Sequence, residues 1–73
     1  MENKIKEIIA SVFNLTVDEI NNDTSMDTII TWDSLNHIKL LSVLEDEFDV
    51  EFDDEQIMGM DSYLKILDII KSL

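Results

Sequence analysis

The chain changes from loop to helix at Thr31-Trp32-Asp33-Ser34-Leu35-Asn36-His37-Ile38-Lys39-Leu40-Leu41. Apolar residues recur there at helical spacing, and the predicted core-facing stripe consists of Leu35, Ile38, Leu41 and Phe48, widened by Leu40, Val43 and Leu44. Either Asp33 or Ser34 could cap this helix, because both side chains accept hydrogen bonds from the free backbone N–H groups of a first turn. The Ser34 hydroxyl is then expected at the positive end of a helix dipole, which would stabilise an attached phosphate. A serine that only caps a helix has the same position.

Apolar periodicity along the chain predicts an all-α fold, a four-helix bundle of three longer helices and one short third helix. The helices are predicted at residues 2–14, 34–49 and 55–58, and from a cap at Asp61 or Ser62 onward. Asp53 or Asp54 is expected to cap the short helix, and Gly59 is expected to end it in a left-handed conformation.

A long ordered loop, residues 15–33, is predicted between the first two helices. Thr16 and Glu19 have the spacing of a capping box, which predicts a single helical turn. Loops of this length are uncommon in small domains, so its apolar side chains are expected to pin it across the bundle. Among them, Trp32 is interpreted as a packed aromatic anchor beside Ser34.

Composition limits the possible partners. The chain of 73 residues is predicted to form one domain, 1–73, and its net charge of −12 favours basic proteins or cations over nucleic acid or an anionic membrane. There is no cysteine, so zinc or redox sites built on cysteine are excluded. No apolar run reaches the ~20 residues of a membrane span, and no signal-peptide pattern is present. We expect a cytoplasmic monomer without membrane insertion.

The motif Asp33-Ser34-Leu35, followed by an amphipathic helix that ends in Leu44-Glu45-Asp46-Glu47-Phe48, resembles the acyl carrier protein family. The resemblance extends over nearly the whole chain. It implies that a phosphopantetheinyl transferase attaches 4′-phosphopantetheine covalently to Ser34, within a motif completed by Asp33 and Leu35. It also implies that the protein is not an enzyme, and that it carries acyl thioesters on the arm's thiol for fatty acid or polyketide biosynthesis.

Between Leu44 and Asp61 every charged side chain is acidic. Acidic residues near a helix C-terminus oppose the helix dipole, which suggests that their charge serves something other than stability. We expect this surface to dock acyl-transferring, condensing or ligating enzymes that carry basic patches. A solvated acidic face is the alternative interpretation. The predicted partner-binding residues are Asn36, Lys39, Glu45, Asp46, Glu47, Asp54 and Glu55.

Some residues depart from the usual pattern of fatty-acid carriers. Asn36 and Lys39 stand where that family usually has acidic residues, Ser42 replaces a hydrophobic residue, and Thr31-Trp32 replaces a leucine-glycine type pair. These departures indicate a specialised stand-alone carrier.

Other functions remain as alternatives. An aminoacyl carrier, of D-alanyl or peptidyl type, would keep the chemistry, but the Gly-Gly-x-Ser approach usual in peptidyl carriers is absent. An unmodified helical interaction module would use Ser34 only as a cap. A hydrolase with Ser34, His37 and Asp33 is disfavoured, because so small a bundle has no oxyanion hole or closed pocket, and His37 is expected to be exposed.

No metal site is predicted. Loops read from Asp23 or from Asp49 lack the glycine and the glutamate that a calcium-binding EF-hand loop requires.

Overall fold

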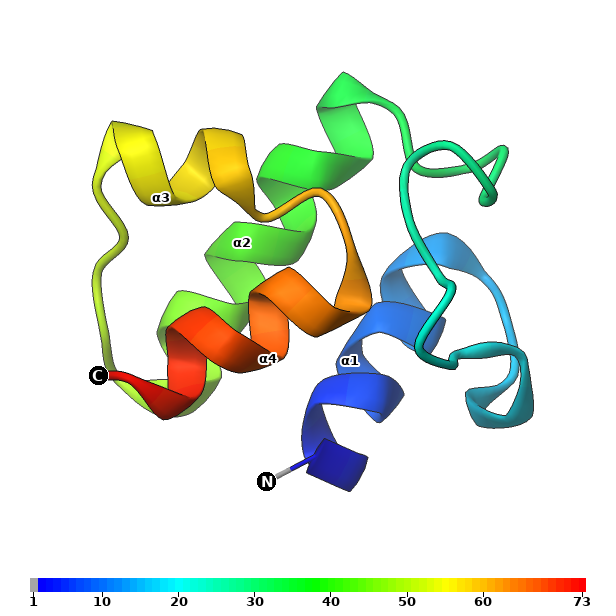
Figure 1. The fold of residues 1–73 in the computed structure, drawn as a ribbon, viewed down its shortest axis with the longest axis horizontal. Coiled ribbons are helices and arrows are strands. Elements are labelled where there is room, and N and C mark those ends of the chain that lie inside the picture. Colours follow the sequence, from blue (N-terminus) through cyan, green and yellow to red (C-terminus); the bar gives the residue numbers. More distant parts are fainter. Residues whose placement is uncertain (1) are drawn as a thin grey trace.

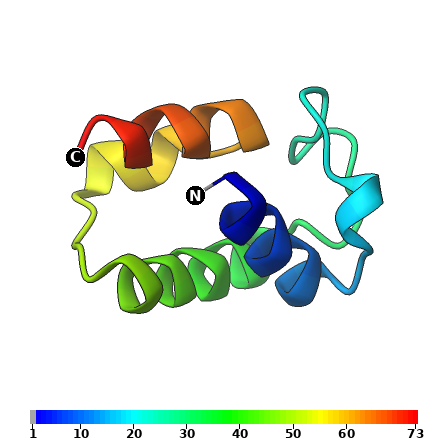
Figure 2. The ribbon, with the colours of Figure 1, turned by 90° about the horizontal axis from the view of Figure 1, so that it is seen from below.

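The computed structural model describes residues 2–73, and Met1 of the predicted domain lies outside them. The elements are α1 (Glu2–Phe13), a 3-10 turn η1 (Val17–Glu19), α2 (Ser34–Phe48), α3 (Asp54–Gly59) and α4 (Tyr63–Lys71). Figure 1 shows the long loop beside α1, and α3 at the opposite side of the molecule. In the turned view α2 lies along one side and α4 with α3 along the other (Figure 2). This arrangement confirms the predicted four helices with a long loop between the first two.

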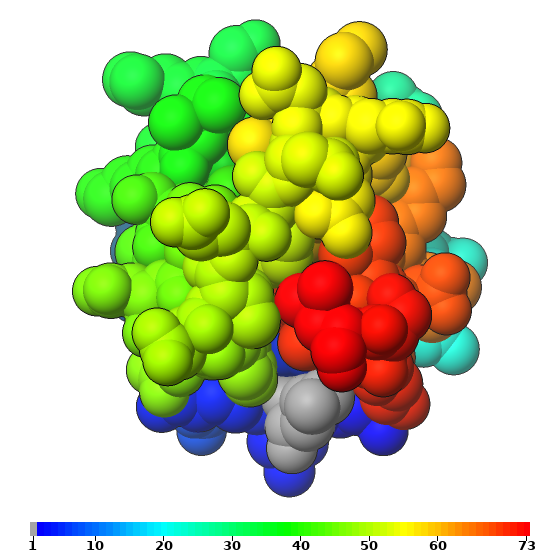
Figure 3. All heavy atoms as spheres, turned by 90° about the vertical axis from the view of Figure 1, so that its left-hand side faces the viewer, coloured from blue at the N-terminus to red at the C-terminus, as the bar shows by residue number. Residues whose placement is uncertain are grey.

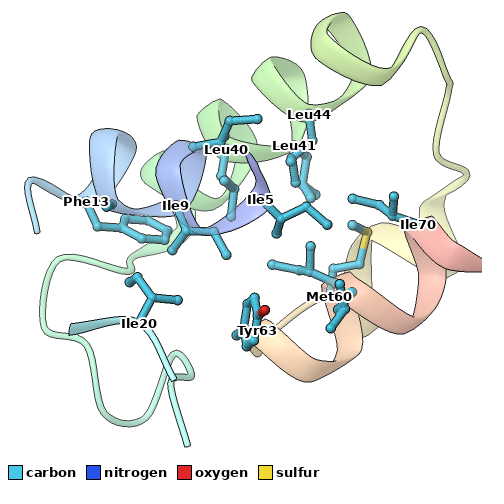
Figure 4. Packing of buried hydrophobic residues seen from close by; sticks show 14 of the residues in the cluster. Ile5, Ile9, Phe13, Ile20, Leu40, Leu41, Leu44, Met60, Tyr63 and Ile70 are labelled. Carbon is cyan, nitrogen blue, oxygen red and sulfur yellow. The ribbon is translucent and has the colours of Figure 1, made fainter. Parts of the chain in front are cut away.

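Helix α1 lies at the centre of the core, because its apolar stripe packs against both α2 and α4. Ile5, Ile9 and Phe13 supply this stripe and are almost fully buried. Figure 4 shows Ile5 and Ile9 between side chains of α2 and side chains of α4, with Phe13 nearer to Ile20 of the long loop. Their buried neighbours are Leu40, Leu41 and Leu44 of α2 and Tyr63, Ile66 and Ile70 of α4. Burying one aliphatic side chain of this size contributes about 1.5–3 kcal/mol, so the cluster holds the three longer helices together.

The stripe predicted for α2 is wrong in part. Leu35 and Ile38 are 79% and 58% exposed, and Val43 is also exposed, whereas His37 is buried. At 100° per residue, Leu35 and Ile38 lie roughly 160° and 100° around the helix from His37. A prediction based on apolar residues alone does not count histidine as a core residue. The predicted core-facing side of α2 was therefore centred too close to Ile38 and did not include His37.

The helix ends also differ from expectation at Gly59. Gly59 is the last residue of α3 and has no positive φ, and the buried Met60 that follows it is the C-cap, with φ −90° and ψ 52°. Left-handed residues instead end the two longer helices, at Asn14 (φ 59°) after α1 and Asp49 (φ 54°) after α2. Asn and Asp adopt this conformation more readily than other non-glycine residues.

The loop between α1 and α2 is tied to the bundle, as expected. Its backbone pairs with the segment before α4, where Met26 N–H donates to Asp61 O (3.0 Å) and Tyr63 N–H donates to Thr24 O (2.9 Å). At the start of η1, Thr16 N–H donates to Glu19 Oε1 (3.0 Å), which agrees with the predicted turn. Ordered backbone pairing of this kind holds the residues that precede Ser34. Within residues 2–73, no helix has the length and apolar character needed to cross a bilayer.

The ionisation of the buried Tyr63 phenol gives a way to test the packing of the core. Burial raises the pKa of the Tyr63 phenol above 10.0, and the negative charge of Glu2 raises it further. The folded protein therefore retains this proton to higher pH than the unfolded chain does. The corresponding stability is present below about pH 10 and is lost as the pH rises through the folded pKa.

We predict that Tyr63→Phe removes this part of the alkaline destabilisation. Urea unfolding between about pH 8 and pH 11 should show a shallower loss of stability in the variant than in the wild type. The variant keeps a ring beneath Lys6, whose Nζ lies 5.5 Å from the ring centroid, so this contact is present in both proteins. Equal pH dependence in the two proteins would contradict the prediction.

Candidate functional site

Ser34 is the first residue of α2, and its side chain is exposed. The cap of this helix is Asp33, whose Oδ1 accepts a hydrogen bond from Asn36 N–H at 2.8 Å. The first N–H groups of a helix have no partner inside it, so the N–H groups of Ser34 and Leu35 remain as donors beside the hydroxyl. Because Asp33 performs the capping, the Ser34 hydroxyl is accessible for covalent modification at the positive end of the dipole.

The segment before Ser34 is fixed by contacts with the first turn of α2 and the end of α1. Asn36 Nδ2 donates to Thr31 O at 2.8 Å, and the Thr31 hydroxyl donates to the last carbonyl of α1, Phe13 O, at 3.0 Å. The Trp32 ring stacks on the Phe13 ring with centroids 4.8 Å apart, which agrees with its interpretation as a packed anchor. The half-buried Asn36, predicted as a partner-binding residue, therefore has a structural contact of its own.

His37 is buried, and the prediction that it is exposed is wrong. Trp32 Nε1–H donates to His37 Nδ1 at 3.0 Å, and His37 Nε2 lies 2.9 Å from Ile57 O. These bonds make it possible for an imidazole to lie at 9% exposure, since each ring nitrogen has a partner. Both nitrogens are occupied, so His37 is not available as a base for Ser34. Among residues 2–73, no three His, Asp or Glu side chains are grouped so that they could hold a metal ion.

Exposed apolar side chains lie on the elements around Ser34. Ile30 in the preceding loop is 99% exposed and Met58 of α3 is 81% exposed, and the sequence pattern predicts neither of them at the surface. With Leu35 and Ile38 they give an apolar character to a surface that composition predicts to be acidic. Figure 3 shows α2 and α3 contributing side chains to one continuous face. One feature of the sequence could have indicated an exposed apolar residue here. Ile29 and Ile30 are adjacent large apolar residues, and of the two only Ile29 packs against the core.

The predicted acidic partner residues fall into two groups. Glu45 is half-buried and its Oε2 accepts from Phe52 N–H at 2.9 Å, while Glu47 lies 3.7 Å from Lys4 Nζ. Asp46 on α2 and Asp54 and Glu55 in the first turn of α3 are exposed. The second group, together with exposed Lys39 and Glu47, is the part of the predicted surface that is accessible to a partner.

Comparison with known proteins gives consistent results. The family model for the phosphopantetheine attachment site matches residues 3–70. The chain is 35% identical over 72 residues to the acyl carrier protein of Buchnera aphidicola subsp. Schizaphis graminum, covering 99% of this chain and 91% of that one. The solved acyl carrier protein of Enterococcus faecalis superposes with a TM-score of 0.79 at 25% identity, covering 97% and 90% of the two chains. A candidate acyl carrier protein from Mycobacterium tuberculosis, at 21% identity, matches the fold with a TM-score of 0.85 over 97% and 95% of the two chains.

We predict that Glu45→Lys destabilises the fold, whereas Asp46→Lys does not. The first change leaves the N–H of the buried Phe52 without its acceptor, at a cost of about 1–3 kcal/mol. The second change is at an exposed position and should stay within about 0.5 kcal/mol of the wild type. Urea unfolding measures both. Glu45→Gln retains a carbonyl acceptor and should fall between them, and equal stability of the two lysine variants would contradict the assignment.

Proposed function

The chain belongs to the acyl carrier protein family, and on that premise we propose that Ser34 carries its 4′-phosphopantetheine. The family has a phosphopantetheine attachment site and is not catalytic itself. The observation that carries the assignment is the exposed Ser34 at the start of α2, relieved of capping by Asp33. Two backbone N–H donors beside the hydroxyl fit the negative charge of a phosphodiester.

The roles of the three motif residues follow from their positions. Asp33 holds the first turn, Ser34 offers the hydroxyl to a phosphopantetheinyl transferase that takes the arm from coenzyme A with Mg²⁺, and exposed Leu35 gives the enzyme an apolar contact. When bound, the arm supplies the thiol that a chain without cysteine lacks, and acyl groups are carried on it as thioesters. A tether of this kind raises the effective concentration of the cargo at each enzyme.

We predict that coenzyme A, Mg²⁺ and a broad-specificity phosphopantetheinyl transferase add a single arm to the wild type and none to Ser34→Ala. Intact-mass spectrometry measures the addition. The substitution leaves the Asp33 cap in place, so circular dichroism should be unchanged. Ser42→Ala, another exposed serine on α2, is the matched control and should be modified as the wild type is. An unmodified wild type would favour the unmodified interaction module.

We further propose that the domain, residues 1–73, docks its enzymes through the exposed apolar and acidic side chains of α2 and α3. The partners are the transferase and acyl-transferring, condensing or ligating enzymes with basic patches. Exposed apolar contacts such as Ile38 and Met58 would provide affinity, and the acidic group of Asp46, Asp54 and Glu55 would steer association. Asn36 and Lys39 reduce the negative charge at the start of α2, which supports a specialised stand-alone carrier. We propose in addition that this carrier acts as a cytoplasmic monomer.

Neutralising the acidic group should raise the KM of the transferase several-fold with little change in kcat. The variant is Asp46→Asn, Asp54→Asn, Glu55→Gln. Because steering is screened by salt, the difference from the wild type should shrink between about 0.05 M and 0.5 M NaCl. Initial rates of modification measure both parameters.

The matched control removes the same amount of charge elsewhere, from exposed carboxylates on the long loop and α4. It consists of Asp18→Asn, Asp23→Asn and Asp68→Asn. An equal rise in KM for the control would show that net charge alone, and not the surface of α2 and α3, attracts the enzyme.

A further inference from the structure

We infer that His37 is a positioning residue for the Ser34 segment, acting through a buried hydrogen-bonded chain from Trp32 to α3. Trp32 Nε1–H donates to His37 Nδ1 at 3.0 Å, and His37 Nε2 lies 2.9 Å from Ile57 O. The chain thus joins the residue two before Ser34, the first turn of α2 and the middle of α3. This inference rests on the proposed attachment at Ser34.

The chemistry of the partners fixes the state of the imidazole. An indole N–H can only donate, so His37 Nδ1 must carry a lone pair and no proton. A backbone carbonyl can only accept, so Nε2 must carry the proton. The chain therefore requires the neutral Nε2–H tautomer, and no other protonation state of His37 makes both bonds.

The two ends of this series of hydrogen bonds are α3, which has few other contacts with the bundle, and Trp32, which lies close to Ser34. Helix α3 has six residues and none of them is fully buried, so few apolar contacts fix it to the bundle. Ile57 is only partly buried, and its carbonyl bond to His37 is a direct polar link between α3 and α2. At the other end, Trp32 is 3% exposed, stacked on Phe13, and separated from Ser34 by the capping residue alone.

The consequence concerns both sides of the proposed attachment site. Loss of His37 would remove the acceptor of the Trp32 indole N–H on one side and the donor to the Ile57 carbonyl of α3 on the other. A transferase would then have to order these segments when it binds, and a cost incurred on binding raises KM more than it lowers kcat. His37 does not touch the reacting atoms, so its contribution is to hold the surface in the shape the enzyme recognises.

The test is a kinetic series on the full chain with coenzyme A and a phosphopantetheinyl transferase. His37→Phe keeps a ring but neither hydrogen bond, and should raise KM roughly tenfold with kcat within about twofold of the wild type. His37→Gln has an amide oxygen and an amide N–H that can replace the acceptor and the donor, and should restore most of the loss. Trp32→Phe removes the indole donor together with part of the buried ring, leaves the bond between His37 and Ile57 O in place, and should give an intermediate KM.

A matched control separates positioning from general destabilisation. Thr24 is a buried polar residue of the same loop, 3% exposed, whose hydroxyl accepts from Asn21 N–H at 2.8 Å. Thr24→Val should lower stability without raising KM. If KM instead follows stability across all variants, His37 is only structural and the inference is overturned.

Nuclear magnetic resonance gives a readout independent of modification. Nitrogen-15 spectra of the His37 ring should show an unprotonated Nδ1 and a protonated Nε2, and the indole N–H signal of the single Trp32 should shift in His37→Phe. A protonated Nδ1 overturns the inference even if Ser34 is modified. An unmodified wild type overturns the proposed function, and the positioning role with it. A modified wild type with an unaltered KM in His37→Phe overturns the positioning role alone.

Discussion

The Asp33 carboxylate caps α2, so the hydroxyl of the adjacent Ser34 is not needed for capping. This separation of the two roles depends on the 2.8 Å hydrogen bond from Asn36 N–H to Asp33 Oδ1. A cap of this kind contributes about 0.5–2 kcal/mol. If Ser34 had to supply the cap itself, modification of its hydroxyl would remove a contact on which the helix end depends. With Asp33 in that role, the hydroxyl can be modified while the first turn keeps its cap. The adjacent Asn36 completes the arrangement by tying the turn back to Thr31.

The long loop extends this constraint to the rest of the molecule. Ordering each backbone residue costs about 1–2 kcal/mol, so a loop is ordered only where contacts offset that cost. Here they come from three directions: the pairing with the segment before α4, the Thr31 bond to the end of α1, and the burial of Ile20 and Trp32. The loop thereby connects α1 and α4 to the start of α2, and Ser34 is presented from a fixed frame.

Sequence patterns could predict the helices, the loop and the position of Ser34 at the start of α2, because these depend on local propensities and on strong apolar periodicity. They left the cap of α2 open between Asp33 and Ser34. They could not predict the face of α2 that is buried. That face includes His37, which is acceptable in a core only because Trp32 and Ile57, brought close by tertiary folding, satisfy both ring nitrogens. The left-handed helix end predicted at Gly59 is also absent, and Asn14 and Asp49, residue types that tolerate a positive φ, take that conformation instead.

The acidic composition has two origins that the sequence alone does not separate. Some acidic side chains accept a hydrogen bond from a backbone N–H at a turn or helix end, namely Glu19, Asp33, Glu45 and Asp53. Glu45 explains why an acid is present near the unfavourable end of the α2 dipole: its partner, Phe52 N–H, lies beyond the helix. The exposed carboxylates of Asp46 on α2 and of Asp54 and Glu55 on α3 have no such hydrogen bond to explain them. They lie on the same two helices as the exposed apolar residues Ile38 and Met58, and their like charges oppose association between copies of the chain through those residues.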